Sequence, residues 1–188
     1  MESTWTSISN QISNLVPQTA AEVEEEKDIN TDGTKKDRYK CLMSVIKDHG
    51  YPCEKHFITT EDNYINCAYR ISGPRGTNAE QNATERSSSD ARPKPVVLYQ
   101  HGLFDSAAGI CMDGKSSIAF YFADHGFDVW MGNQRGNRNS KNHKYKECSE
   151  DDFWNFSFYE LGKYDQPALI SYILRETEVP NLSYIGHS

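Results

Sequence analysis

The chain has 188 residues, of which 37% are hydrophobic, and its formal net charge at pH 7 is −7. This length is sufficient to bury a hydrophobic core, and the acidic balance argues against a nucleic-acid partner. No apolar run approaches the ~20 residues of a membrane-spanning helix, and residues 1–11 contain no basic segment followed by an apolar one, so no signal peptide is visible.

The first 37 residues are polar and include the acidic run Glu22-Val23-Glu24-Glu25-Glu26. A segment with so few apolar residues cannot bury enough surface to offset the entropy lost on ordering. We therefore predict a disordered tail over residues 1–37 and one folded domain over residues 38–188. Within this domain, residues 72–92 are rich in Gly, Ser, Asn and Arg, which predicts a flexible loop.

A short helix and a β-hairpin are predicted at the start of the folded domain. Apolar side chains recur at helical spacing between residues 38 and 48, namely Leu42, Val45 and Ile46. Residues 56–59 and 65–71 favour two strands, the second with apolar side chains in alternation. Asn63 lies in the turn between them and tolerates the left-handed backbone geometry that a tight turn requires.

Strands and helices alternate over the rest of the domain. Strands are predicted over residues 96–100, 127–131 and 182–186, and helices over residues 116–125 and 166–177. We expect Ile118 to face the core from the first of these helices, the last strand to be buried, and residues 132–150 to form a polar loop. This alternation indicates an α/β fold with a mostly parallel sheet and flanking helices.

Two of these strands end in motifs that carry chemistry. The last strand runs into Gly186-His187-Ser188, the front half of the Gly-x-Ser-x-Gly turn that lifts a nucleophilic serine above a sheet. The strand over residues 96–100 runs into His101-Gly102-Leu103, where a backbone N–H can stabilise negative charge on a substrate oxygen. We therefore predict Ser188 as the nucleophile and the Leu103 amide as an oxyanion-hole donor. Taken alone, each motif also fits an ordinary structural turn.

The two histidines beside these motifs are poor candidates for the general base. His187 is the middle residue of Gly-x-Ser, and its side chain should leave the turn in another direction. His101 precedes the oxyanion loop and is expected to be a packed, hydrogen-bonded loop residue. A catalytic triad of this type has the chain order serine, then acid, then histidine, so both partners should follow Ser188.

A polar cluster and an aromatic cluster each allow two interpretations. The polar cluster flanks Gly132 and Gly136 and consists of Asp128, Asn133, Arg135 and Asn137. Its spacing is not that of a phosphate-binding loop, and a buried Arg–Asp pair that braces loops is favoured over a role in substrate binding. The aromatic cluster consists of Phe153, Trp154, Phe156, Phe158 and Tyr159. Core packing is favoured for these rings over binding of acyl chains.

Several long motifs follow one another between about residue 49 and residue 188. They are His49-Gly50-Tyr51-Pro52-Cys53-Glu54, Thr60-Glu61-Asp62-Asn63-Tyr64-Ile65, Gln100-His101-Gly102-Leu103, Gly126-Phe127-Asp128-Val129-Trp130-Met131-Gly132-Asn133-Gln134-Arg135-Gly136-Asn137, Phe153-Trp154-Asn155-Phe156-Ser157-Phe158, Lys163-Tyr164-Asp165-Gln166-Pro167-Ala168 and Tyr184-Ile185-Gly186-His187-Ser188. In this order they make the chain resemble the acid lipases, the gastric and lysosomal group of α/β-hydrolases. Asn63 stands where that family usually has Gly.

This resemblance implies the amino-terminal part of an α/β-hydrolase lipase domain, which stops after the nucleophile strand. It implies a fragment of a lipid ester hydrolase that forms an acyl-enzyme on Ser188 and acts on triacylglycerols or sterol esters, without cofactor or metal. The full-length protein would contact a lipid interface, and the family is mostly secreted or lysosomal. Because the acid and the histidine would follow Ser188, we expect the 188 residues alone to be inactive.

Two other functions fit the same residues. One is a different α/β-hydrolase reaction, such as that of a carboxylesterase, a thioesterase or a peptidase, because these enzymes share the triad. The other is a degenerate, non-catalytic protein that keeps the fold as an interaction module. Residues that follow Ser188 would discriminate between them, since an enzyme needs the second glycine of the turn, an acid and a late histidine.

Overall fold

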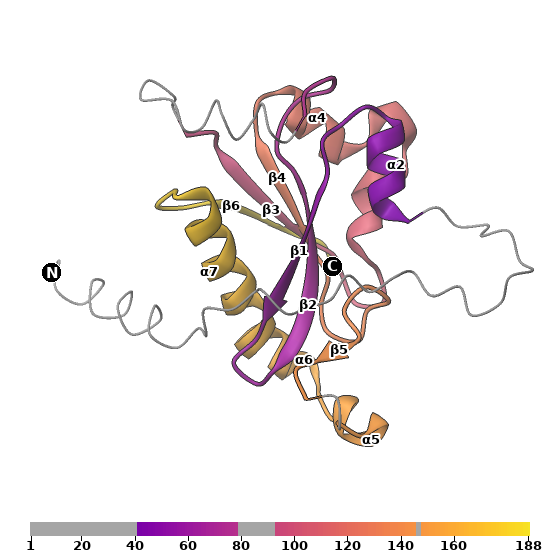
Figure 1. Ribbon diagram of the computed structural model, residues 1–188, viewed down its shortest axis with the longest axis vertical. Helices are drawn as coiled ribbons and strands as arrows, with labels where there is room; N and C mark the ends of the chain where they lie inside the picture. The colour runs from indigo at the N-terminus through magenta and orange to yellow at the C-terminus, as the bar shows by residue number, and fades with distance from the viewer. Residues whose placement is uncertain (1–40, 79–92, 146–147) are drawn as a thin grey trace, which may run out of the picture. The chain divides into compact units, whose positions relative to one another are not determined.

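The computed structural model describes residues 41–78, 93–145 and 148–188 (Figure 1). The predicted tail over residues 1–37 and most of the predicted loop over residues 72–92 lie outside these ranges, so both stay predictions. The described residues contain a mixed sheet with helices packed on both of its faces.

The sheet consists of strands β1 (Glu54–Thr59), β2 (Tyr64–Ile71), β3 (Val96–Gln100), β4 (Asp128–Gly132), β5 (Asn142–His143) and β6 (Ser183–Gly186). Its order is β1-β2-β4-β3-β6, and β5 pairs with the start of β2. β3 runs parallel to β4 and β6, whereas β2 is antiparallel to β1 and β4. The predicted α/β fold is confirmed, and the hairpin of β1 and β2 adds the antiparallel part of the sheet.

The helices begin and end close to their predicted positions. The longer ones are α2 (Leu42–Asp48), α4 (Ile118–Asp124) and α7 (Gln166–Thr177). The short ones are η1 (Ala107–Cys111), η2 (Gly114–Ser116), α5 (Glu150–Phe153), α6 (Phe158–Glu160) and the π-helical η3 (Leu161–Asp165). Pro167 is tolerated in the first turn of α7, and the left-handed residue Glu178 ends that helix. Among the described residues, no helix has the length and apolar character needed to cross a membrane.

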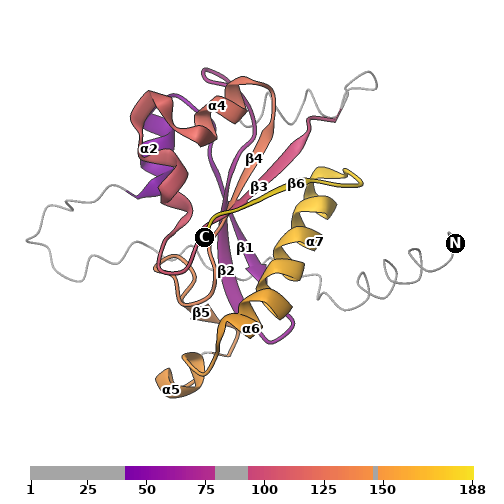
Figure 2. The ribbon, with the colours of Figure 1, turned by 180° about the vertical axis from the view of Figure 1, so that it is seen from behind.

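Different helices bury the two faces of the sheet (Figures 1 and 2). On one face, Ile46 of α2 and Phe120 of α4 belong to a core cluster with residues of β2, β3 and β4. On the other face, Ile173 of α7 belongs to a cluster with Leu98 of β3 and Trp130 of β4. All five residues of β3 and of β4 are buried as a result, as expected for central strands covered on both sides.

Two burial predictions were wrong. Ile118 is 52% exposed, and Phe120, which is 1% exposed, faces the core instead, because α4 begins at Ile118 and turns its first side chain to the surface. The residues of β6 are exposed rather than buried, because this strand lies at the end of the sheet order and pairs only with β3. The predicted polar loop over residues 132–150 also contains β5 and the start of α5.

The turn between β1 and β2 has the geometry that the sequence predicts. Asn63 adopts a φ of 72°, in the left-handed region, and its amide donates to the carbonyl of Thr60 at 3.0 Å. Asn is one of the few residues besides Gly that adopt this region at modest cost. The prediction that the turn forms with Asn at position 63, where the family usually has Gly, is therefore confirmed.

A pair of Ile→Ala variants tests this assignment of the core. Ile173→Ala should lower the free energy of unfolding by about 3 kcal/mol, because it removes buried methyl groups and leaves a cavity under α7. Ile118→Ala should change it by less than about 0.5 kcal/mol, because that side chain lies at the surface. Denaturant titration of both variants measures the difference, and equal losses would contradict the assignment.

Candidate active site

Parallel pairing of β3 and β6 brings the two predicted motifs together. Gln100 is the register partner of Gly186, and the pairing continues beyond the strand because the His187 amide donates to the Gln100 carbonyl at 3.0 Å. A Cβ atom added to Gly102 would lie 2.7 Å from the His187 carbonyl oxygen and 3.1 Å from Ser188 Cβ. A side chain at position 102 would therefore collide with the backbone that carries Ser188.

The backbone is strained on both sides of this contact. Ser188 has a φ of 53°, and Phe104 has a φ of 65°. Each lies in the left-handed region, which costs a residue other than Gly roughly 1–2 kcal/mol. The Phe104 strain belongs to a tight turn, in which the Asp105 amide donates to the Gly102 carbonyl at 3.2 Å. Strain of this kind persists only where the surrounding structure enforces it.

The backbone amide of Leu103 takes no part in the hydrogen bonds of the turn. Among the described residues, no group accepts a hydrogen bond from its amide. Its side chain is exposed, and that of Phe104 is 99% exposed. The turn that approaches Ser188 at Gly102 therefore carries an N–H group without a described partner and two exposed apolar side chains. The roles predicted for Ser188 and Leu103 stay predictions, although the two residues do lie in adjoining turns.

His101 is the packed loop residue that the sequence predicts. It is buried, its Nδ1 lies 2.7 Å from the Gly102 carbonyl oxygen, and its Nε2 accepts from the Gln134 amide at 3.4 Å. The carbonyl can only accept, so the ring proton sits on Nδ1. Both ring nitrogens are therefore engaged, and His101 braces the turn at Gly102 instead of offering a base to Ser188.

Asp128 and Arg135 of the predicted polar cluster are both ion-paired, but each pairs with residues outside the cluster and not with the other. Arg135 Nη1 and Nη2 donate to Asp62 at 2.6 and 2.8 Å, and its Nε donates to Asp165 at 2.9 Å. Asp128 instead accepts from Nε and Nη2 of Arg70 at 2.9 and 2.5 Å. The bracing role is thus found with partners that the sequence analysis missed.

The missed carboxylates join distant parts of the chain at the loop after β4. Asp62 lies in the hairpin turn, and Asp165 lies at the end of η3, directly before α7. Asp165 also accepts from the backbone amide of Arg135 at 3.0 Å, and the guanidinium carbon lies 3.8 Å from the centre of the Tyr64 ring. Both carboxylates stand inside motifs that carry the family resemblance, which was the only sequence signal for them.

Charge pairing sets the pKa values in this group. Burial alone would raise the pKa of Asp62, but hydrogen bonds from Arg135 and Thr60 and the charge of Arg135 outweigh it and lower the pKa from 3.8. Burial would likewise lower the pKa of Arg135, yet the hydrogen bonds and charges of Asp62 and Asp165 raise it. The ion pair therefore persists below the pH at which an ordinary aspartate takes up a proton.

Core packing holds for only part of the aromatic cluster. Phe153 is buried and Phe156 is half-buried, where their rings contact Tyr64. Three other rings are exposed, contrary to the prediction: Trp154, Phe158 and Tyr159. These three lie on the short segments α5 and α6 and the turn between them, which extend beyond the cover of the sheet (Figure 1).

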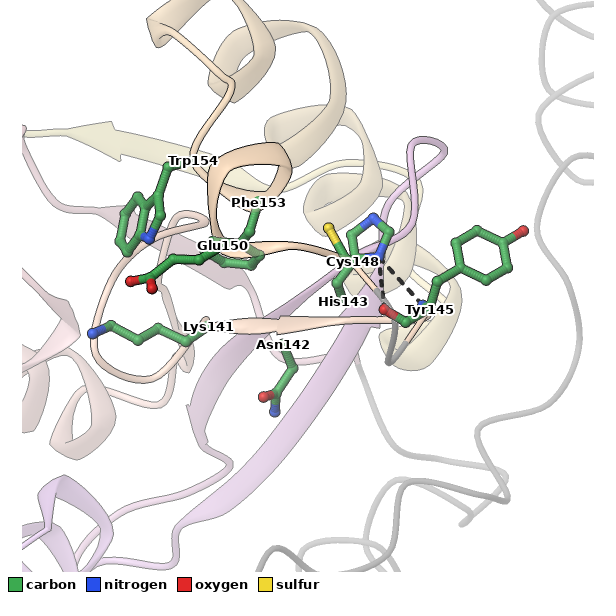
Figure 3. A pocket seen from close by; sticks show the side chains of 8 residues that line it. All are labelled: Lys141, Asn142, His143, Tyr145, Cys148, Glu150, Phe153 and Trp154. Atoms are coloured by element: carbon green, nitrogen blue, oxygen red, sulfur yellow. Dashed lines mark hydrogen bonds between the residues drawn. The ribbon is translucent and has the colours of Figure 1, made fainter.

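A separate hollow of about 460 Å³ lies beside β5 (Figure 3). It is lined by Lys141, Asn142, His143, Tyr145, Cys148, Glu150, Phe153 and Trp154. Figure 3 shows the side chains of Lys141 and Glu150 extending in the same direction from two neighbouring segments. Neither Ser188 nor Leu103 lines this hollow, and the described part of the chain has no cluster of three or more His, Cys, Asp or Glu residues able to hold a metal ion.

Comparison with known proteins assigns the fold to a family. Residues 42–114 match the family described as a partial alpha/beta-hydrolase lipase region, and residues 95–188 match the alpha/beta hydrolase fold. The chain belongs to the α/β-hydrolase family. The second match covers β3, β4, α7 and β6, the hydrolase elements that bring the Gly102 turn against Ser188.

Several curated relatives of this α/β-hydrolase chain are lipases. It is 46% identical over 148 residues to lysosomal acid lipase/cholesteryl ester hydrolase of Homo sapiens, covering 78% of this chain and 35% of that protein. It is 44% identical over 148 residues to gastric triacylglycerol lipase of Rattus norvegicus, with the same coverage of 78% and 35%. It is 42% identical over 155 residues to Lipase 1 of Drosophila melanogaster, covering 82% and 31%. The resemblance to the acid lipases is confirmed, and the chain spans about a third of the length of these relatives.

Replacing Asp62 by Asn tests the charge pairing around Arg135. The folded-state pKa of Asp62 lies below its unfolded value of 3.8, so its ionised form stabilises the fold above that pH. Asp62→Asn should lower the free energy of unfolding by about 2 kcal/mol at pH 7, the scale of a hydrogen bond between charged groups. The deficit should shrink as the pH falls below 3.8, because Asp62 of the unfolded parent chain then takes up a proton, and it should vanish once the pH passes the lower pKa of the folded state.

Urea titrations between pH 7 and pH 3 measure this difference. Glu61→Gln is the matched control, because Glu61 is an exposed carboxylate in the same turn. Its variant should track the parent protein throughout. A deficit of Asp62→Asn that stays constant with pH would show that the charge of Asp62 contributes nothing.

Proposed function

We propose that this chain carries the nucleophile and one donor of the oxyanion hole of a lipid ester hydrolase. The observation that carries this proposal is the contact between the Gly102 turn and Ser188 at the carboxyl ends of the parallel strands β3 and β6. Ligands of open α/β sheets bind at this edge, outside the carboxyl ends of the strands. The lipase relatives support the same class of reaction.

The reaction begins when Ser188 Oγ attacks the carbonyl carbon of an ester. Negative charge develops on the carbonyl oxygen, to which the Leu103 amide donates a hydrogen bond. The tetrahedral intermediate then collapses with cleavage of the ester C–O bond. The alcohol leaves with the proton that the general base took from Ser188, and the acyl group remains on the serine. Water attacks this acyl-enzyme, the fatty acid departs and the hydroxyl group is restored.

The general base and its acidic partner are proposed to come from outside the 188 residues. Both ring nitrogens of His101 are engaged with the Gly102 carbonyl and the Gln134 amide. In α/β-hydrolases the acid and the histidine follow the serine along the chain, and the residue after the serine gives the second oxyanion donor. The matched region covers only 35% of the human and rat lipases, so those proteins extend well beyond it.

The proposed substrate is a neutral lipid ester, either a triacylglycerol or a sterol ester, met at a lipid interface. Two relatives carry these substrate classes in their names, one as a cholesteryl ester hydrolase and one as a triacylglycerol lipase. The exposed side chains of Leu103 and Phe104 support this proposal, because they offer apolar surface on the turn whose Gly102 contacts Ser188. An acyl chain placed there would bury surface that water now covers.

Ser188→Ala in the complete polypeptide is the direct test. It should lower kcat on a nitrophenyl butyrate substrate by about 10⁴-fold or more, because loss of the attacking oxygen leaves only transition-state binding. Labelling by a fluorophosphonate, which captures activated serines, should disappear in parallel. A variant that keeps its turnover, or that is still labelled at another residue, would refute the assignment. Emulsified triolein and cholesteryl oleate then separate the two proposed substrates.

For residues 1–188 alone we expect no serine-dependent turnover of a short-chain nitrophenyl ester. The physical reason is that no hydrogen bond joins a described histidine to Ser188, and both ring nitrogens of the neighbouring His101 are already engaged. The purified 188-residue chain and its Ser188→Ala variant should give the same background rate. Turnover that the substitution abolishes would contradict this expectation.

A further inference from the structure

The loop after β4 contacts the loop after β3 at three points. The buried side chain of Asn133 accepts from the Ala107 amide at 3.0 Å. The Gln134 amide donates to His101 Nε2 at 3.4 Å. Asn137 Nδ2 donates to the Asp105 carbonyl at 2.7 Å. These contacts hold residues 101–107 at both ends, His101 and Ala107, and at Asp105 between them. The same segment contains the proposed oxyanion donor.

The Asn137 contact acts on the strained part of that segment. Asp105 is the last residue of the turn that begins at Gly102, and Phe104 at φ 65° is its third residue. A type II turn requires this positive φ at its third residue and normally has Gly there. Phe104 gains no packing in return, because its side chain is 99% exposed. The bond from Asn137 to the Asp105 carbonyl therefore helps to enforce a backbone conformation that the sequence itself disfavours.

Asn137 is itself held firmly in place. Its Oδ1 accepts from the Asn139 amide at 3.0 Å, and its carbonyl accepts from the Ser140 amide at 2.8 Å. Two residues earlier, Arg135 is fixed by Asp62 and by the start of α7. A donor anchored in this way can restrain the Gly102 turn, whereas a mobile side chain could not.

We infer that Asn137 is a positioning residue for the oxyanion hole, holding the Gly102–Asp105 turn so that the Leu103 amide faces the carbonyl carried to Ser188. The inference rests on the proposed function and deepens it. Asn137 does not touch the reacting atoms. It acts through the Asp105 carbonyl, and its effect should fall on the transition state, where the oxyanion is fully formed, more than on binding of the ester.

Asn137→Asp in the complete polypeptide isolates this donor. The variant keeps an oxygen for the Asn139 amide but replaces the NH2 group with a second oxygen facing the Asp105 carbonyl. With nitrophenyl butyrate, kcat should fall by about tenfold while KM stays within about twofold, because a misplaced donor weakens transition-state stabilisation. Asn142→Asp is the matched control, since no described residue is hydrogen-bonded to the Asn142 side chain. It should leave both constants unchanged.

A second substitution separates positioning from general damage to the fold. Phe104→Gly removes the cost of the positive φ, so the turn should need less restraint from Asn137. The fall in kcat caused by Asn137→Asp should therefore be smaller in a Phe104→Gly background than in the parent protein. Asn137→Ala serves the same comparison if Asn137→Asp does not fold, and thermal midpoints show that each variant is folded.

The possible outcomes separate the role of Asn137 from the proposed ester hydrolase function on which it rests. An unchanged kcat for folded Asn137→Asp, an equal fall for Asn142→Asp, or no relief by Phe104→Gly would overturn the role of Asn137. Each of these results leaves the proposed function standing if Ser188→Ala still abolishes turnover. Retention of turnover by Ser188→Ala would instead remove the function itself, whatever the effect at position 137.

Discussion

The parallel pairing of β3 with β6 is the constraint on which the candidate site depends. It sets Gln100 opposite Gly186, and both chains then leave the sheet at the same edge. Gly102 and Ser188 meet there so closely that no side chain fits at position 102. Parallel strands of one sheet run in the same direction and end at the same edge, so the proposed nucleophile after β6 and the proposed backbone donor after β3 become neighbours without a direct bond between their side chains.

The loop after β4 stabilises this edge by linking elements that the sheet leaves apart. Arg135 binds the hairpin turn through Asp62 and the start of α7 through Asp165. α7 leads into β6, so the same arginine fixes the approach to Ser188 and, through its neighbours in the loop, the turn at Gly102. A buried guanidinium loses its hydration, and two carboxylates are needed to compensate for this loss. The two ion pairs that offset the lost hydration of Arg135 also join three segments: the loop after β4, the hairpin turn and the residue before α7.

Elements with a local sequence signal were predicted correctly. Features that depend on residues far away in the chain, such as ion-pair partners and the burial of β6, were not. The bounds of β3 and α7 agree with prediction. The pattern of apolar residues in each segment, and Pro167 at the start of α7, are signals that lie within the segments themselves. The left-handed turn residue Asn63 and the packed His101 were also predicted. The partners of Arg135 lie 73 and 30 residues away, and no spacing rule connects them. The exposure of β6 likewise depends on its neighbours in the sheet and not on its own residues.

The proposed donor is a backbone amide, which has a consequence for how the site can be built. Every residue except proline carries this N–H group, so the identity of residue 103 matters less than the path of the chain around it. The chemistry therefore constrains the neighbours: a glycine at position 102 because there is no space for a Cβ, a left-handed residue at 104, and amide side chains at 133 and 137 that hold the loop. Side-chain amides suit this task, because they bind a neighbouring carbonyl or N–H without adding a charge where the negative oxyanion must form.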